Sequence, residues 1–496
     1  MSQQEHEFDL NTIKKLFQKS ADIQFQEYSF NEQKVQFITC DAMIDQQMLN
    51  GVIIQRIQYL YDQLDDVSFE ENIARHLHVP SLQKIQDKEQ LISSVYSGFL
   101  LMYFEQDHLL YASNIAKKPN RKPEETRMEV LIKGPRDNFI EDIRVNIALI
   151  RKRLPTNSFC VEKVELGKRS KTTVAILYFE DIVDMDILHG IKKQLAAVDT
   201  DIVFSGDLLM ERVNKNSKLF PKFDYTGRPD YAVQALARGR FVIFVDGVAY
   251  CIITPVNLFL LLKSAEDNEY PVIFSSVERV LRILGILIGL LLPAFWLALT
   301  TYHQNQLPLQ LLATVVQAKA GLPLPSSLEM LLMLLMFELF REAGLRLPSV
   351  IGGTISVVGG IIIGDAAIRA GVTSPEMIVV IAISTIASFT LVNQSLVTSV
   401  SILRVAFILA SAFFGLFGFF VSLYLTLLYL CNIRIYGYSY MNLATDLNWS
   451  TIKKSIFRLS PKGYTERNKA LAPQDATRSA NAHIEDIEDK KDQENN

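Results

Sequence analysis

The second half of the chain is nearly free of charged side chains. Of the 104 Asp, Glu, Lys and Arg residues in the 496 positions, 11 lie in the 153 positions from Val280 to Asn432. Apolar stretches of this length fold in lipid as helices, because a helix pairs its own backbone polar groups where there is no water. The sequence therefore predicts a soluble part followed by an all-α, multi-pass membrane domain.

The soluble part alternates helix and strand patterns. Thr172–Phe179 and Phe241–Val245 have the length and composition of buried strands, and Asn138–Leu154 has the apolar spacing of an amphipathic helix. A polar, proline-containing break at 117–124 divides the region. We therefore expect a cytosolic α/β region of two subdomains. The net charge of −4 gives no sign of a nucleic-acid surface.

Composition also predicts the domain boundaries. Residues 1–20 form a polar segment, mobile or loosely docked, and lack the apolar run of a secretory signal. We expect α/β subdomains at 21–116 and 125–275, the membrane domain at 276–435, and a polar cytosolic tail at 436–496 that is disordered beyond about 464. The four cysteines are widely scattered, so we expect them to be reduced and structural.

Five apolar segments are candidates for crossing the membrane: Val280–Tyr302, Leu328–Leu339, Val350–Ile368, Met377–Val392 and Ile402–Cys431. A crossing helix needs roughly 17–25 residues, so two of them are short, and the last must tilt, extend beyond the lipid or break. Lys and Arg residues flank the first and last segments, which favours a cytosolic location for both ends. An even number of crossings is then required, so one candidate must be non-spanning or split.

The stretch from Arg341 to Ser401 is too polar and too rich in small residues for a passive anchor. Four of its serines are spaced by four, seven and four, which places them on one face if the helix is continuous. Such a face could line a water-filled pathway, or its hydroxyls could bond to i−4 carbonyls or to a neighbouring helix. A nearby asparagine slightly favours the water-filled pathway, because a carboxamide within the membrane needs a hydrogen-bond partner or water. The pore-lining candidates are therefore Ser384, Ser388, Asn393, Ser395 and Ser399.

Glycines in the same stretch predict close helix packing. The candidates are Gly352, Gly353, Gly359, Gly360 and Gly364, of which the last two form a G-x-x-x-G pattern. Glycine lets helix backbones approach without side chains between them, and a direct role in gating or permeation is the alternative.

Charged residues within or beside the apolar runs would be costly if they faced lipid alone. These residues are Glu338, Arg341, Glu342, Asp365 and Arg369. Spacings of three and four allow local ion pairs on a helix. The alternative is a network that couples the cytosolic region to the membrane bundle.

Enzymatic signatures are weak throughout. The Gly-Lys pair at Lys168 lacks the first glycine and the Ser or Thr of a phosphate loop. The aspartates between Asp181 and Asp186 lack the glycine and glutamate of a calcium loop, and His76 and His78 lack a third zinc ligand. We expect a protein that is not an enzyme, without catalytic residues, metal or cofactor.

Several blocks of ten or so residues, in order, give a more specific signal. They are GPRDNFIEDIRVNIALIRKR (134–153), GRFVIFVDG (239–247), LPAFWLALTTYH (292–303), FELFREAGLRLP (337–348) and IASFT (386–390). Together they resemble the A-subunit family of bacterial spore germination receptors, over about residues 125–440. The blocks LVNQSL (391–396) and GRPD (227–230) depart from the usual pattern of that family.

The resemblance implies a multi-pass protein of the inner spore membrane with a cytosolic N-terminal region. It implies as partners a multi-pass B subunit, a lipoprotein C subunit and further copies of the chain. It also implies a germinant-gated pathway that releases monovalent cations at the onset of germination. Two alternatives remain open: a non-conducting scaffold subunit, and an accessory paralogue that amplifies germination without sensing nutrients.

Overall fold

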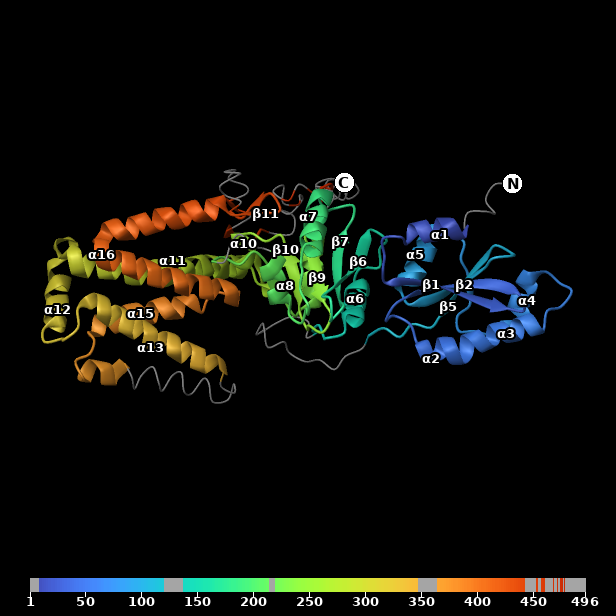
Figure 1. The fold of residues 1–496 in the computed structure, drawn as a ribbon, viewed down its shortest axis with the longest axis horizontal. Coiled ribbons are helices and arrows are strands. Elements are labelled where there is room, and N and C mark those ends of the chain that lie inside the picture. The colour runs from blue at the N-terminus through green and yellow to red at the C-terminus, as the bar shows by residue number, and fades with distance from the viewer. Residues whose placement is uncertain are drawn as a thin grey trace, which may run out of the picture. The chain divides into compact units, whose positions relative to one another are not determined.

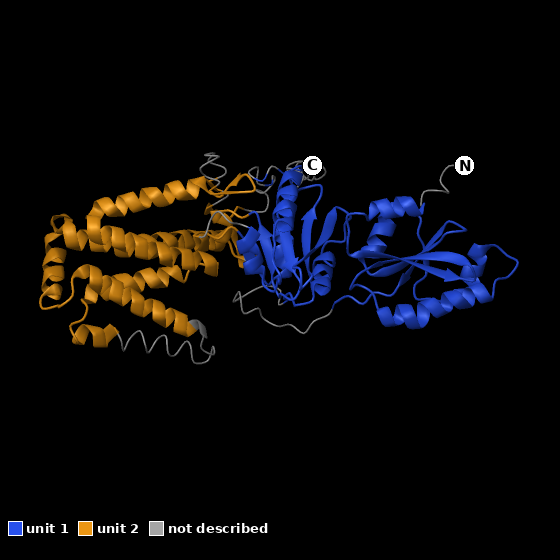
Figure 2. Cartoon of the chain, in the orientation of Figure 1, with its two compact units in different colours: residues 1–216, 223–255, 464–496 blue, residues 217–222, 256–463 orange. Residues whose placement is uncertain are grey.

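The computed structural model describes residues 9–119, 137–213, 219–346 and 364–441, with short pieces at 452–453, 456–459, 467, 471, 473–475 and 477. The chain forms two compact units (Figure 2). Unit 1 comprises residues 1–216, 223–255 and 464–496, and unit 2 comprises residues 217–222 and 256–463. Unit 1 is α/β and unit 2 is helical, as the sequence predicts (Figure 1).

The first sheet of unit 1 is antiparallel, with the strand order β1-β2-β4-β5-β3. Its strands are β1 (Ile23–Phe30), β2 (Gln33–Cys40), β3 (Gln83–Lys84), β4 (Phe99–Phe104) and β5 (Leu109–Asn114). Alternate residues of β4 are buried on opposite faces, because side chains alternate along a strand. One face packs on α3 (Ile54–Asp62) and α4 (Phe69–His76), and the other packs on α1 (Leu10–Leu16) and α5 (Lys88–Tyr96). The short α2 (Gln46–Met48) and a π-helical turn (Leu49–Ile53) precede α3.

The N-terminal segment is more firmly held than its polarity indicates. Ile13 of α1 and Phe17 just after it are buried among the residues of the first sheet, with 1% and 2% of their surface exposed. The expectation of a mobile or loosely docked segment is therefore wrong for residues 10–17. Two apolar side chains at helical spacing are enough to fix this helix.

The second sheet of unit 1 is also antiparallel, in the order β6-β7-β9-β10-β8. It comprises β6 (Phe159–Leu166), β7 (Thr172–Phe179), β8 (Asp224–Thr226), β9 (Phe241–Val245) and β10 (Cys251–Thr254). Its helices are α6 (Ile143–Arg151), α7 (Met185–Ala196), α8 (Gly206–Val213) and α9 (Pro229–Ala237). The predicted helix at 138–154 begins later, at Ile143, because the Asp142 side chain caps it by accepting from the amide of Arg144.

A buried ion pair joins the two α/β subdomains. Arg151 of α6 donates through Nε and Nη2 to the carboxylate of Asp22, at 2.8 and 2.9 Å, and neither side chain is more than 2% exposed. The guanidinium also lies over the rings of Tyr96 and Phe159. A backbone bridge between Ser20 and β6 adds to this contact. The subdomains therefore share one buried polar joint.

Unit 2 begins earlier than composition predicts. The second subdomain was expected to extend to residue 275, but residues from Val256 onward belong to the helical unit. The reason is the apolar run in α10 (Leu258–Leu261), whose Leu260 and Leu261 pack into the core of the helices. At the other end of the chain, Arg467 donates to the carbonyl of Ala237, and the amide of Gln474 donates to the carbonyl of Ile182, both in unit 1. These described residues contradict a wholly disordered tail beyond 464.

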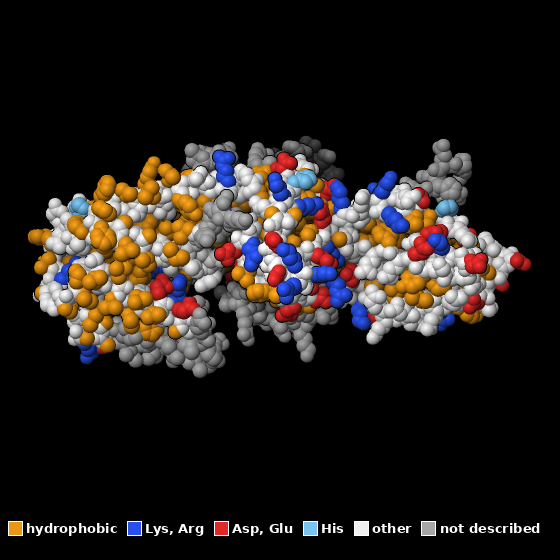
Figure 3. Space-filling view, in the orientation of Figure 1, with side chains coloured by type: hydrophobic (Ala, Val, Ile, Leu, Met, Phe, Trp, Pro, Cys, Tyr) orange, Lys and Arg blue, Asp and Glu red, His pale blue; other side chains and the backbone are white. Residues whose placement is uncertain are grey.

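Five longer helices make up most of unit 2: α11 (Val272–Tyr302), α12 (Leu309–Lys319), α13 (Ser326–Arg346), α15 (Pro375–Ser388) and α16 (Gln394–Asn432). Residues 364–369 are helical, two 3₁₀ turns lie at Ala265–Asn268 and Gln304–Gln306, and β11 (Arg434–Ile435) pairs with β12 (Tyr438–Ser439). Among the described residues, α11 and α16 are long and apolar enough to cross a membrane. Figure 3 shows hydrophobic side chains spread over the visible face of this unit. Most of the Val350–Ile368 candidate lies outside the described residues.

The longest helix, α16, is broken at Gly415. This residue has φ 60° and ψ −140°, a conformation that favours glycine. The backbone oxygen of Ala410 lies against the position of a side chain at Gly418, whereas residues eight apart in a straight helix are ~12 Å apart along the axis. The chain therefore reverses into two legs, 394–414 and 416–432, seen as two rods in Figure 1. The candidate at Ile402–Cys431 was expected to tilt, to extend beyond the lipid or to break, and in the structure it breaks. It is therefore one of the split segments that an even number of crossings allows.

A candidate functional site among the apolar helices

The five pore-lining candidates do not share one continuous helix. α15 ends at Ser388, and α16 begins six residues later at Gln394. The Asn393 side chain caps α16 by accepting from the amide of Leu396 at 3.0 Å. Asparagine favours such a cap because its carbonyl oxygen satisfies an amide that the helix leaves unpaired. The condition for a single polar face, one continuous helix, is therefore not met.

Three of the candidate serines lie inside the subunit. Ser384 and Ser388 are 0% and 1% exposed, and Ser399 is also buried. Ser384 donates to the carbonyl of Gly289 on α11 at 2.8 Å, and Ser388 donates to the carbonyl of Ser384 at 2.9 Å. Bonding to an i−4 carbonyl or to a neighbouring helix, the alternative to a water-filled wall, is thus what these hydroxyls do. Ser395, near the start of α16, is exposed.

Arg404 contacts two of these serines, Ser384 and Ser388. It lies on α16, its side chain is 1% exposed, and it is the only charged residue between Glu376 and Arg434. Its Nη1 donates to Ser384 Oγ at 3.2 Å, and its Nη2 donates to Ser388 Oγ at 3.1 Å and to Ser401 Oγ at 3.3 Å. Sequence reasoning did not select Arg404, although a single charge in so long an apolar run was a visible signal.

Two of the predicted charged residues complete the cluster around Arg404. Glu338 and Arg341 of α13 pair at 2.6 Å, as their spacing predicts. Glu338 Oε1 also lies 3.7 Å from Arg404 Nη2, and Arg341 Nη1 donates to Ser401 Oγ at 3.2 Å. The local ion pair is therefore part of a network that joins α13, α15 and α16. We call Glu338, Arg341, Ser384, Ser388, Ser401 and Arg404 the arginine network.

Two other predicted charges pair with each other outside the arginine network. Asp365 and Arg369 form a local pair at 2.8 Å, and more than half of each side chain is exposed. Glu342 is exposed on α13. Local pairing, rather than a single five-residue network, accounts for Asp365 and Arg369.

In the described part of the chain, two glycines outside the predicted set bring helices together. Gly352, Gly353, Gly359 and Gly360 lie outside the described residues, and a side chain added at Gly364 would meet only Ile378, at 3.9 Å. On α11, however, a Cβ at Gly289 would lie 2.9 Å from Ser388 Oγ, and a Cβ at Gly285 would lie 2.7 Å from the carbonyl oxygen of Ala387. The G-x-x-x-G of 285–289 was the sequence signal for this contact.

Replacing Gly285 by valine is expected to displace α15 from α11. The new side chain meets a backbone oxygen that cannot rotate away, and overpacking of this kind costs about 1–3 kcal/mol or more. We expect the thermal unfolding midpoint in detergent to fall by roughly 2–10 °C. Gly364→Val is the matched control, since the nearest described neighbour of a Cβ there is Ile378, at 3.9 Å. Equal midpoints for the two variants would contradict the packing contact.

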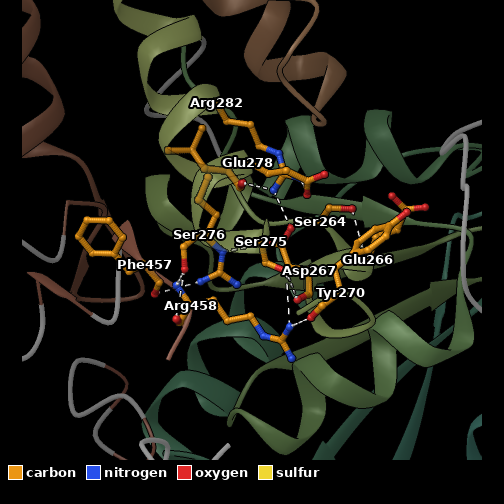
Figure 4. Close-up of polar contacts among 12 residues, drawn as sticks. Ser264, Glu266, Asp267, Tyr270, Ser275, Ser276, Glu278, Arg282, Phe457 and Arg458 are labelled. Atoms are coloured by element: carbon orange, nitrogen blue, oxygen red, sulfur yellow. Dashed lines mark hydrogen bonds and ion pairs between the residues drawn. The ribbon is translucent and has the colours of Figure 1, made fainter. Parts of the chain in front are cut away.

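A second buried cluster lies at the start of α11. Asp267, 1% exposed, accepts from Arg279 Nε at 2.7 Å and from Arg282 Nη1 at 2.8 Å (Figure 4). The same turns of α11 hold a segment from beyond the last helix: Arg279 Nη1 donates to the carbonyl of Phe457, and the Arg458 amide donates to Ser276 Oγ. We call this the Asp267 cluster. It connects the first long helix to the C-terminal segment of the same unit.

The positions weighed as enzymatic sites show ordinary structural contacts. Lys168 pairs with Asp199 on the surface, Asp184 caps α7, and His76 contacts Asp65. In the part of the chain that the structure describes, no group of three His, Cys, Asp or Glu residues could hold a metal ion. None of the four cysteines is in a disulfide, and three of them are buried. Burial raises the pKa of Cys160 to about 12.

Comparisons with known proteins add an independent line of information. The model of the Bacillus/Clostridium GerA spore germination protein family matches residues 11–470. Spore germination protein XA of Bacillus anthracis is 40% identical over 401 residues, which are 81% of this chain and 82% of that protein. Spore germination protein KA of Bacillus subtilis (strain 168) is 28% identical over 470 residues, covering 94% and 86% of the two chains. GerLA of Bacillus cereus is 30% identical over 439 residues, covering 88% and 89%.

The chain is also similar to a solved structure, the crystal structure of the N-terminal domain of the A subunit of the Bacillus megaterium spore germinant receptor GerK3. The match has a TM-score of 0.39 and 22% identity, and covers 50% of this chain and 92% of that one.

Proposed function

The chain belongs to the GerA family of spore germination proteins, and from this premise we propose that it is an A subunit that forms or lines a germinant-gated pathway for monovalent cations. The subunit would oligomerise in the inner membrane of the spore. It would cross that membrane several times, keep its α/β unit in the cytosol, and act together with a multi-pass B subunit and a lipoprotein C subunit. No enzymatic step is part of this proposal.

The observation that carries the proposal is the arginine network. A guanidinium buried in an apolar helix is costly in lipid, so such residues mark functional positions by default. Here the charge on Arg404 is held by hydroxyls from α15 and a carboxylate from α13. A helix that only anchored the chain would have no need of it.

The proposed pathway wall is the exposed polar start of α16. Gln394 and Ser395 are exposed there, and so is Thr398 about one turn later, before the helix becomes apolar at Ile402. Ser384, Ser388 and Ser399 already bond within the subunit, so we assign the wall to Ser395 and its two neighbours. Copies of the chain arranged around an axis would place these polar side chains together, as channels do with rings of like residues.

A charge at Ser395 is expected to act on ion release by its sign. In spores with this chain as the sole A subunit, Ser395→Lys should slow potassium release in nutrient broth by about tenfold. A unit charge ~4 Å away is worth ~1 kcal/mol in water and more beside a low-dielectric wall. Ser395→Asp is the matched control, because it adds a unit charge of the opposite sign. It should leave potassium release unchanged or make it faster. The same slowing by both variants would contradict a cation pathway here.

The non-conducting scaffold has one observation in its favour. The second leg of α16 exposes large apolar side chains, including Phe417 at 71% and Tyr424 at 65%, which suit contact with lipid or with partner helices. A scaffold would need such a surface, but it would not need a water-filled pathway along the axis of an oligomer. The scaffold hypothesis predicts that Ser395→Lys and Ser395→Asp have the same effect on potassium release. An accessory paralogue that amplifies germination without conducting ions predicts the same.

A further inference from the structure

We propose that Arg404 is a charge lock that holds α15 and α16 against α13 in the resting subunit, and that the pathway opens when Arg404 releases Glu338 and the α15 serines. This inference rests on the function proposed above and assigns the step that gates it. Arg404 lies on α16, Ser384 and Ser388 on α15, and Glu338 on α13. One side chain therefore joins three helices.

The contacts of Arg404 do not fully satisfy its guanidinium. Among the described residues, Glu338 is the one carboxylate within 4 Å, at 3.7 Å, and Arg341 holds that same carboxylate at 2.6 Å. The remaining acceptors are neutral hydroxyls at 3.1–3.3 Å, and Arg404 Nε has no partner in the described part of the chain. A guanidinium binds most strongly to a carboxylate in a two-bond pair. A competing acceptor could therefore draw Arg404 away.

The hydroxyls that accept from Arg404 tie the lock to the backbone. Ser384 donates its own proton to Gly289 on α11, and Ser388 donates to Ser384. Each oxygen thus presents its lone pairs to Arg404, while its proton is held by a carbonyl. Loss of Arg404 would leave these buried oxygens without a donor, which favours a shift of α15 that brings them to water.

The surrounding chain allows α15 to move as a short rod. It has 14 residues, ends at Ser388, and is followed by non-helical residues before α16 begins. Its contact with α11 is made over Gly285 and Gly289, so no α11 side chain blocks it at these positions. Switches commonly work by such displacement of one packed element between two arrangements.

The test uses the full-length protein. It measures the accessibility of the buried face of α15 in lipid nanodiscs, and ion leak in liposomes. The background is Cys431→Ser, since Cys431 is the exposed cysteine. Ile381→Cys places a thiol at a position that is 0% exposed on the inner face of α15, and Val379→Cys, at 55%, is the exposed control. The probe is a charged, water-soluble methanethiosulfonate, and the rate of modification is the readout.

Arg404→Gln should speed modification of Ile381→Cys by about tenfold or more, as expected when a charge-assisted bond is lost from a two-state equilibrium. Arg404→Lys keeps the charge and should restore part of the protection. Arg369→Gln, which removes an exposed arginine, should change nothing. If Arg404→Gln does not yield a monodisperse protein, Glu338→Gln decides, because it leaves Arg404 in place and removes its counter-charge.

The outcomes separate the lock from the proposed function. Faster modification together with germinant-independent potassium leak supports both. Faster modification with no flux from any variant or from the wild type supports the lock and overturns the pathway. Unchanged modification in Arg404→Gln and Glu338→Gln overturns the lock, whether or not the wild type conducts.

Discussion

Replacing Arg151 by alanine is expected to lower the free energy of unfolding of the α/β unit by about 3–5 kcal/mol. The change leaves the Asp22 carboxylate buried without the guanidinium that neutralises it. The readout is hydrogen exchange at the amides of Ala21 and Val161, which bond across the junction between the subdomains. Exchange there should become roughly 10²–10³-fold faster. Both tryptophans lie outside unit 1, so tryptophan fluorescence would not report this change.

Arg153→Ala is the matched control for this prediction. Arg153 follows α6 and pairs with Asp137 at the same 2.8 Å, but that pair is partly exposed. Exposed pairs contribute about 0–1 kcal/mol, so exchange should rise by less than about fivefold. Similar exchange rates in the two variants would show that the subdomains are held together by other contacts.

Replacing Asp267 by alanine is expected to release the C-terminal segment from the start of α11. Two nearly buried arginines lose their shared carboxylate, and breaking such a cluster costs about 3–5 kcal/mol. Arg279 also loses the bond that orients it toward the carbonyl of Phe457. Trypsin should then cut after Arg458 about 10²-fold faster, because the Arg458 side chain is otherwise held by Tyr270 and Ser275.

Glu278→Ala provides the comparison. Glu278 pairs with Arg282 at 3.3 Å one turn away on α11, and its side chain is 30% exposed. Its loss should change the rate of cutting after Arg458 by no more than a few-fold. Equally fast cutting in both variants would mean that Asp267 does not hold the segment.

The sequence was most informative where one local signal determines the structure. The strand at Thr172–Phe179 has the predicted bounds, because a run of β-branched and aromatic residues ends at a polar turn. The need for α16 to tilt, extend or break followed from its length, and Gly415 is where the chain can adopt a positive φ. The local pairs of Glu338 with Arg341 and of Asp365 with Arg369 followed from helical spacing.

The arginine network could not be predicted because its contacts join different helices. Periodicity shows that Ser384 and Ser388 share a face, but not whether that face meets water or Arg404. The break between α15 and α16 contains no glycine or proline, and depends on the side-chain cap at Asn393. The G-x-x-x-G pattern occurs both at Gly360–Gly364 and at Gly285–Gly289, and the pattern alone does not show that the second pair is the one that packs on α15. For the arginine network and for the glycine contact, the deciding neighbour lies far away in the sequence.

The most direct test of the proposed ion pathway is electrical recording from the purified, full-length oligomer in a planar bilayer. Under a potassium chloride gradient we expect discrete current steps whose reversal potential lies near that of potassium. Ser395→Lys should shrink these steps and Ser395→Asp should preserve them. A monodisperse protein that supports germination in spores, yet gives no current with the proposed B and C subunits present, would contradict the claim that this chain forms or lines the pathway.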